Sequence, residues 1–585
     1  MKRFTADFET ATWDPKETWV WAWALCDIEN PENVNIGNNI ETFFERIEKE
    51  NNPYIYFHNL KFDGEFIIYY LLKNDFEHVE SREKRTHTFS TLISDMGLFY
   101  TIEVYFNVGK KTKKVTFIDS LKIINQTVES MPKTFNIEEN KLEIDYNLPR
   151  KKGHILTKQE EDYVKNDVVI VAKALKYLFD MGLTKITAGS NALSEYKEIM
   201  KVNRFRSLYK PLNYDIDKDI RKSYRGGFTY LNPLYKNKTV GATIVLDVNS
   251  LYPSVMRFES LPFGEPYFYE GEYIEDKIYP LYIQRLTCSF KIKEGKIPTI
   301  QIKHSRFVDN EYLTDSGIEP VALTLTNIDL KLFLEQYDVW DLHYESGWKF
   351  KSMKGLFTDY IEKWIAVKNE STISGNKGMR QVAKILLNSL YGKFATSLDV
   401  QSKIPYLENE IVKYKLGEKE TKEGVYLPMG SFITAYARDK TIRTSQAIRD
   451  YSIKKYGKDL YYYSDTDSCH TGLSEEDLKE FCDIDDVKLG AWKIEENCRK
   501  EKFIRQKTYL SDVWNKDKKC YEIQITCAGL PQRCYDQVTW ENFQEGLKVN
   551  GKLTFNHVQG GVILTETEFT IKEDKKLIKA IENFK

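Results

Sequence analysis

The sequence has none of the features of a secreted, disulfide-linked or membrane protein. Its eight cysteines include no CxxC pair and no zinc-like spacing, so we expect reduced thiols. The N-terminal segment lacks the apolar core of a signal peptide, and no apolar run approaches the length of a membrane span. We therefore predict a soluble, intracellular protein that is not secreted.

The sequence also shows no charge bias, internal repeat or low-complexity linker. Its 85 basic residues nearly balance its 87 acidic ones, so the net charge is −2 and any nucleic-acid surface must be local. What it does have is 585 residues, 42% of them hydrophobic. That is enough for several packed domains.

The most informative stretch is YYYSDTDS at residues 461–468. Its aromatic start predicts a strand, and Asp465 and Asp467 would point the same way on an extended chain. Two adjacent like charges repel, and they are kept mainly where a divalent cation needs oxygen ligands. A lone DxD is more simply a polar turn. A third aspartate, Asp247, after an apolar strand at 243–246, favours a metal site.

Four carboxylates in the first third of the chain lie on or after predicted elements, so the fold could bring them together. They could hold two Mg²⁺ or Mn²⁺ ions, one to activate water and one to stabilise the leaving oxygen. Tyr163, one helical turn before the last of them, could orient that water. The four are Asp7 and Glu9 on one face of a predicted strand at 4–8, Asp63 after a predicted strand at 54–57, and Asp167 on a predicted helix at 160–179.

This set resembles the DEDD family of 3′-to-5′ exonucleases in its tyrosine variant. The resemblance is carried by DFET at 7–10, FHNLKFDG at 57–64 and YVKND at 163–167. Taken singly, each carboxylate is more simply a solvated surface group. Lys141 could stabilise the scissile phosphate, although alone it would be a surface lysine.

Groups suited to a single-stranded DNA end surround these carboxylates. They combine hydrogen bonding with stacking surfaces, as single-strand sites require. Phe62 could equally belong to the core. The predicted contacts are His58, Asn59 and Phe62, with Ser120 and Leu121 after a predicted strand at 115–118.

Two features of the middle region suit a nucleic-acid enzyme. The pair of glycines in YRGG at 224–227 allows a loop to lie against a phosphate backbone, although GG alone is only a turn. Residues 377–394 have helical spacing, with two cations, an amide and a tyrosine on one face. A triphosphate and its sugar would need such a face, and a solvated basic face is the alternative. The four residues are Arg380, Lys384, Asn388 and Tyr391.

Three further motifs, in order, resemble motifs A, B and C of the family B DNA polymerases. YRGG, a KTY triplet and an exonuclease that begins near residue 7 narrow the resemblance to the protein-primed polymerases of small tailed Bacillus phages. The resemblance covers about residues 4–571, and 573–585 have no counterpart. Ser464 stands where close relatives commonly carry cysteine, which is not a ligand position. Motif A corresponds to DVNSLYP at 247–253, motif B to KILLNSLYG at 384–392 and motif C to YSDTDS at 463–468. The KTY triplet lies at 507–509.

The resemblance implies a role for each matching residue. Asp247 and Asp467 would bind Mg²⁺ or Mn²⁺, two ions per active site, with Asp465 in the same cluster and Val248 as a further ligand. Tyr252 and Tyr391 would hold the nucleotide, with Tyr252 as steric gate. Arg380, Lys384 and Asn388 would complete the nucleotide site. Tyr224, Gly226, Gly227, Thr434, Arg438, Lys507 and Tyr509 would bind template-primer DNA.

The implied architecture is multidomain α/β (α+β), an RNase H-like exonuclease followed by a right-hand polymerase with two insertions. The strand-rich, proline-broken segment 259–357 is longer than a palm needs. The predicted divisions are exonuclease 1–187, palm 188–258 and 429–527, fingers 358–395, terminal-protein insertions 259–357 and 396–428, and thumb with tail 528–585.

The implied function is DNA-directed DNA synthesis with 3′-to-5′ proofreading, primed by a protein and displacing a strand of a linear viral genome. Expected partners are primer-template and single-stranded DNA, dNTPs, a terminal protein, and viral single-strand and double-strand DNA-binding proteins. We expect a monomer, or a heterodimer with terminal protein, in the cytoplasm of an infected bacterium. Alternatives are a binding factor with an inert polymerase half, a stand-alone exonuclease, and an oligonucleotide-primed relative. Basic runs at 110–114 and 150–152 could track DNA or be solvated loops.

Overall fold

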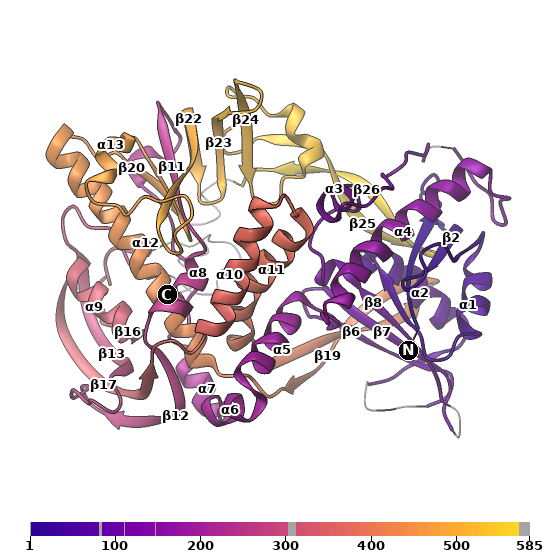
Figure 1. The fold of residues 1–585 in the computed structure, drawn as a ribbon, viewed down its shortest axis with the longest axis horizontal. Helices are drawn as coiled ribbons and strands as arrows, with labels where there is room; N and C mark the ends of the chain where they lie inside the picture. Colours follow the sequence, from indigo (N-terminus) through magenta and orange to yellow (C-terminus); the bar gives the residue numbers. More distant parts are fainter. Residues whose placement is uncertain are drawn as a thin grey trace.

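A computed structural model describes residues 2–80, 83, 85–109, 112–146, 148–301 and 312–572. Two eight-stranded sheets organise its two halves, and helices pack on both, so the expected mixed α/β class is confirmed (Figure 1). The antiparallel helix pair α10 (Thr358–Ile373) and α11 (Lys377–Phe394) stands between the halves in this view. None of the helices in these ranges is both long and apolar enough to cross a membrane.

The N-terminal sheet has the strand order β3-β2-β1-β4-β8-β7-β6-β5, with β1, β4 and β8 parallel at its centre. Buried aromatic side chains on one face pack against α1 and α2, and α4 covers the other face. The elements are β1 (Arg3–Thr10), β2 (Val20–Asp27), β3 (Val34–Gly37), α1 (Ile40–Glu48), β4 (Tyr54–Phe57), α2 (Leu60–Lys73), β5 (Glu77–His78), β6 (Thr88–Ile93), β7 (Phe99–Asn107), β8 (Lys113–Asp119), η1 (Ser120–Lys122), η2 (Val128–Ser130), α3 (Met131–Phe135) and α4 (Lys158–Asp180).

The second sheet has the order β24-β23-β22-β11-β21-β20-β9, and β10 pairs with β22. Its central strands are aromatic and aliphatic, and the long helix α12 packs behind them. The elements are α5 (Ala188–Met200), α6 (Val202–Leu208), α7 (Tyr214–Arg221), β9 (Thr229–Leu231), η3 (Pro233–Tyr235), β10 (Lys238–Val240), β11 (Thr243–Val248), α8 (Leu251–Phe258), α12 (Leu427–Tyr456), β20 (Tyr461–Asp465), β21 (Ser468–Thr471), α13 (Glu475–Lys479), β22 (Trp492–Arg505), β23 (Thr508–Asn515), β24 (Cys520–Cys527) and η4 (Gln532–Gln537).

Three segments interrupt or follow this sheet as smaller β units. Between α8 and α10 the chain forms a four-stranded sheet of order β12-β17-β13-β16, which confirms that this segment is rich in strands. Two long hairpins, β18–β19 and β25–β26, extend from the half that holds the second sheet toward the N-terminal sheet (Figure 1). The elements are β12 (Leu261–Glu270), β13 (Leu281–Ile292), β14 (Ile300–Gln301), β15 (Tyr312–Leu313), β16 (Val321–Thr326), α9 (Asn327–Gln336), β17 (Tyr337–Met353), β18 (Asp399–Glu408), β19 (Ile411–Thr421), β25 (Lys548–Val558) and β26 (Gly561–Thr570).

The described residues of the two basic runs differ in their surroundings. Arg150 is only 3% exposed, pairs with Glu160 at 2.8 Å, and lies over the Trp21 ring. A buried guanidinium with these partners fixes the segment before α4. Arg150 is therefore neither a DNA-tracking residue nor part of a solvated loop. Lys114 pairs with Glu103 at 2.9 Å. Lys110, Lys111 and the tail 573–585 lie outside the described residues.

Two candidate catalytic sites

The first site collects the four N-terminal carboxylates. Asp7 and Glu9 lie on β1, Asp63 on the first turn of α2, and Asp167 on α4. The backbone N–H of Phe8 donates to Asp63 Oδ1 at 3.2 Å, which fixes α2 against β1. The β1–β4 pairing and the α4 packing therefore bring together residues that are 160 positions apart, as predicted for this set.

Burial and mutual repulsion dominate the charge state of this site. Burial, then the charge of Asp167, raises the pKa of Asp7 to about 7. Burial and neighbouring carboxylates also raise the pKa values of Glu9 and Asp63 well above their ordinary range. The ammonium of Lys141 lies 3.4 Å from Asp167 Oδ2 and opposes the rise in the pKa values of Asp7, Glu9 and Asp167.

The donor chemistry fits hard divalent cations. Asp167 Oδ1 is buried without a hydrogen-bond partner, and the carboxylates raise one another's pKa values, so Lys141 alone does not offset the negative charge of the cluster. Across the described ranges, no three His, Cys, Asp or Glu side chains are already gathered closely enough to hold an ion. Repulsion between like charges accounts for carboxylates that are neighbours without converging on one point.

Tyr163 is in place beside the carboxylates, and it has a partner that the sequence analysis missed. Its hydroxyl is 2.5 Å from that of Tyr146, and burial, then the charge of Glu9, raises the pKa values of both. Tyr146 is 46% exposed, so the pair connects the buried cluster to the surface. Tyr146 lies in a segment without regular secondary structure, where no periodicity could have indicated it.

The predicted single-strand residues are adjacent to this cluster, but they are not equally exposed. His58 uses both ring nitrogens, Nδ1 with Ser120 Oγ at 3.0 Å and Nε2 with the Gln126 carbonyl at 2.8 Å. Ser120 is fully buried, so its hydroxyl supports His58 rather than facing solvent. Asn59 is exposed in a left-handed conformation, and the N–H groups of Asn59 and Leu121 both donate to Asp119 Oδ1.

The second site lies at the ends of β11 and the β20–β21 hairpin. The Val248 N–H donates to the Asp467 carbonyl at 2.8 Å, which holds the two strand ends together. Burial, then the charges of Glu495 and Asp467, raises the pKa of Asp247 to about 6. Lys493 lies 3.2 Å from Asp247 Oδ1. The sequence analysis did not identify Lys493 or Glu495, because only strand pairing of β11 with β22 brings them here.

The chain turns between the two aspartates of the DTD motif. The expectation that Asp465 and Asp467 point the same way on an extended chain is therefore wrong. Thr466 has φ +61°, and its N–H donates to the Phe228 carbonyl at 2.6 Å, which turns the chain between the two aspartates. Asp465 instead pairs with Lys507 Nζ at 2.8 Å. Asp467 remains with Asp247, and burial followed by the charge of Asp465 raises its pKa.

The predicted nucleotide residues also come together. The rings of Tyr252 and Tyr391 stack with centroids 4.1 Å apart. Arg380, Lys384 and Asn388 are all exposed along one side of α11.

Lys368 on α10 joins this cationic group and was missed, because it belongs to another helix. Its Nζ donates to Ser250 Oγ at 3.1 Å, and burial, then the charges of Arg380 and Lys493, lowers its pKa.

Besides Ser120, two further predicted DNA contacts are internal instead. Arg438 is 2% exposed and donates to the carbonyls of Arg225 and Gly226, each at 2.8 Å, and to both carboxylate oxygens of Asp329. Thr434 is 1% exposed and bonds within α12. Neither side chain can reach DNA from its position here, so we correct both predictions. Arg438 instead holds the YRGG loop.

The loop at residues 224–227 lies directly against the acidic hairpin. A Cβ at Gly227 would be 2.6 Å from Thr466 Oγ1, so the close approach requires glycine. Gly226 is exposed and Tyr224 half-buried, which leaves both available to a ligand. Tyr509 packs against Tyr463 with ring centroids 5.3 Å apart, so it supports the strand that leads to Asp465.

A surface pocket joins the neighbourhoods of the two sites. It has a volume of about 460 Å³ and lies between η1 and α11. Leu121 and Lys122 line one side, and Lys384 and Asn388 line the other. A residue expected at the single-strand site and two expected at the nucleotide site therefore face the same hollow.

Comparison with known proteins gives one consistent result. The model of the family "DNA polymerase type B, organellar and viral" matches residues 45–159 and 143–483. The DNA polymerase of Bacillus phage Nf is 42% identical over 98% of this chain and 100% of its own length. A structure of Phi29 DNA polymerase with primer-template DNA and incoming nucleotides matches this chain with a TM-score of 0.91 and 41% sequence identity. A structure of the same polymerase with single-stranded DNA matches it with a TM-score of 0.90 and 40% sequence identity. Each covers 98% of this chain and 100% of the solved chain.

Proposed function

This chain belongs to the organellar and viral type B DNA polymerases, and from that premise we propose that it combines DNA-directed DNA synthesis with a separate 3′-to-5′ proofreading exonuclease. The observation that carries the proposal is the presence of two carboxylate clusters on two different sheets. Cationic side chains suited to a triphosphate and two stacked tyrosines lie beside the cluster of the second sheet. A tyrosine pair and a lysine lie beside the cluster of the N-terminal sheet.

In the synthesis site, each side chain has a distinct task. Asp247 and Asp467, with the backbone of Val248, would hold two Mg²⁺ or Mn²⁺ ions. When bound, such ions supply Lewis-acid stabilisation of charge on the reacting phosphates. The carboxylates sit at strand ends that a hydrogen bond already fixes, so little reorganisation is needed to position a primer end.

The nucleotide would lie between the acidic hairpin and α11. Arg380, Lys384 and Lys368 offer positive charge for a triphosphate, with Asn388 beside them. The stacked rings of Tyr252 and Tyr391 form a flat floor, and a sugar 2′-hydroxyl would collide with Tyr252. We assign Lys507, now paired with Asp465, to the primer end.

In the exonuclease site, Asp7, Glu9, Asp63 and Asp167 would hold the second pair of ions. The Tyr163 hydroxyl, oriented by Tyr146, positions the attacking water. Lys141 places a cation where charge develops on the scissile phosphate.

The finer assignments are also proposals. We propose the divisions given above, namely an exonuclease at 1–187, a palm, fingers and thumb, and two terminal-protein insertions at 259–357 and 396–428. We further propose priming by a terminal protein hydroxyl, strand displacement, and work in the infected host's cytoplasm with viral single-strand and double-strand DNA-binding proteins. The solved complexes of Phi29 DNA polymerase with primer-template DNA, incoming nucleotides and single-stranded DNA support DNA and dNTPs as partners.

A gel assay with a 5′-labelled primer-template and Mg²⁺ tests the core of the proposal. We expect extension when all four dNTPs are present and shortening when they are absent. Shortening under both conditions would leave only an exonuclease, and extension without any shortening would remove the proofreading site. Initiation at a genome end only with the terminal protein would separate protein priming from the oligonucleotide-primed alternative.

A further inference from the structure

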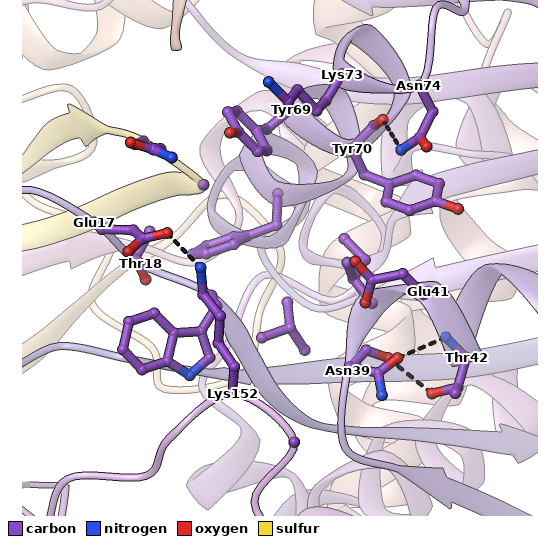
Figure 2. Close-up of a pocket in the computed structure, with 17 residues that line it drawn as sticks. Glu17, Thr18, Asn39, Glu41, Thr42, Tyr69, Tyr70, Lys73, Asn74 and Lys152 are labelled. Carbon is purple, nitrogen blue, oxygen red and sulfur yellow. Dashed lines mark hydrogen bonds and ion pairs between the residues drawn. The ribbon is translucent and has the colours of Figure 1, made fainter.

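The turn of the C-terminal hairpin β25–β26 is docked on the loop between β1 and β2. The Thr18 N–H donates to the Gln559 carbonyl at 2.8 Å, and the Gln559 N–H donates to the Lys16 carbonyl at 3.3 Å. A Cβ at Gly560 would lie 1.8 Å from the Thr18 carbonyl oxygen, so only glycine permits this approach. The docked turn closes one side of a pocket of about 610 Å³ beside Glu17, Thr18 and Lys152 (Figure 2).

A second contact fixes the strand β25 against α2. Glu65 of α2 is 3% exposed, and its Oε1 lies 3.2 Å from Nε2 of His557. Tyr414 of the other long hairpin donates to the opposite oxygen of the same carboxylate at 2.6 Å. Three chain segments therefore meet at one buried carboxylate. The position of β25 is defined by these polar contacts and by the backbone contacts of the hairpin turn.

This docking brings an aromatic side chain from the end of the chain to the first turn of α2. The rings of Phe555 and Phe62 lie 6.2 Å apart with an interplanar angle of 51°. The ammonium of Lys61 is 4.8 Å from the Phe555 centroid. All three side chains keep part of their surface exposed, and Phe62 directly precedes the carboxylate Asp63.

We propose that Phe555 and Lys61, together with Phe62, form a stacking site for an unpaired nucleotide of single-stranded DNA. The inference rests on the proposed exonuclease function, because the site adjoins Asp63. An aromatic face accepts any base, and an ammonium pairs with any phosphate, so the site would bind without sequence preference. The C-terminal hairpin would thereby supply one wall of the path to the N-terminal cluster, about 490 residues away in sequence.

The test measures binding without relying on hydrolysis. The full chain carrying Asp7→Ala and Glu9→Ala is titrated with single-stranded oligonucleotides that carry 2-aminopurine at each of the last few 3′ positions in turn. Adding Phe555→Leu keeps an apolar side chain but removes the aromatic face. We expect binding to weaken roughly tenfold and the fluorescence change at one internal position to disappear. Phe555→Tyr should retain both.

Two comparisons make the result decisive. Asn556→Ala changes an exposed neighbour on the opposite face of β25, and it should leave affinity unchanged. If Phe555→Leu binds like its parent, the Phe555–Phe62 contact is only core packing and the inference is overturned. If the chain with intact carboxylates fails to degrade single strands while the Phe555 effect persists, the exonuclease proposal fails and the stacking site stands.

Discussion

The buried pair between Arg438 and Asp329 should hold the YRGG loop, and its removal should open that loop. Arg438 is the donor in contacts with two loop carbonyls and both oxygens of Asp329, and the two side chains are 3% and 12% exposed. Burial alone would raise the pKa of Asp329, but Arg438 and Arg225 outweigh it and hold that pKa below its ordinary value. The carboxylate is therefore charged and depends on its cations.

Arg438→Ala leaves that carboxylate with only Arg225 as a nearby cation and leaves two carbonyls unpaired. Removing one partner of a buried pair costs about 3–5 kcal/mol. Since Arg225 remains, we expect the lower end, about 3 kcal/mol, or roughly 150-fold faster opening. The measurement is hydrogen exchange by mass spectrometry of peptides covering residues 224–231 and 327–336, because exchange reports local opening in a multidomain chain.

Arg443→Ala is the matched control on the same helix. Its guanidinium pairs with Glu335 and Asp439 but is 42% exposed, so its loss should cost less than about 1 kcal/mol. Arg438→Ala with Asp329→Ala should recover part of the loss, because no charge is then left buried. Equal exchange in the Arg438 and Arg443 variants would refute the assignment of Arg438 as the residue that holds the loop.

Three further predictions concern the two sites. Asp467→Ala should abolish primer extension and leave degradation of single-stranded DNA within about twofold, and loss of both activities in a gel assay would indicate misfolding. Asp7→Ala with Glu9→Ala should remove degradation while extension survives, and residual degradation near the parent rate would mean that the exonuclease set is misassigned. The pKa of Asp7 is about 7 in the folded chain and about 4 in the unfolded chain. Protonation of Asp7 therefore stabilises the folded chain fully below about pH 4, and this stabilisation is lost as the pH rises through about 7. The unfolding temperature of the metal-free chain should therefore fall between pH 5 and 8, Asp7→Asn should flatten that fall, and added Mg²⁺ should raise the temperature most at pH 8. A fall of the same size in Asp7→Asn would assign the pH dependence to other groups.

Local patterns in the sequence predicted the elements that hold the carboxylates. The strand at 54–57 and the helix at 377–394 appear with the predicted bounds, because their aromatic run and their helical spacing are local properties. Asp7, Glu9, Asp63 and Asp167 become neighbours because β1, the first turn of α2 and one face of α4 adjoin beside the parallel centre of the sheet.

What the sequence could not provide depends on long-range contacts. Arg438 and Thr434 lie on a 30-residue helix with buried residues on several faces, so their residue types alone did not show that they point inward. Lys368 and Lys493 reach the second site from other elements, and nothing in their spacing connects them with Asp247. The turn at Thr466 depends on a hydrogen bond to Phe228, more than 200 residues earlier.

The proposed function assigns to one chain two separate sites that work on the same DNA end. The most direct test is a primer-template with a mismatched 3′ nucleotide, followed in a single binding event with Mg²⁺, dNTPs and a DNA trap. We expect the mismatch to be removed before extension. Asp467→Ala should remove the mismatch and continue to shorten the primer without extending it, and Asp7→Ala with Glu9→Ala should never remove the mismatch. Loss of mismatch removal in Asp467→Ala, with folding intact, would contradict two independent sites.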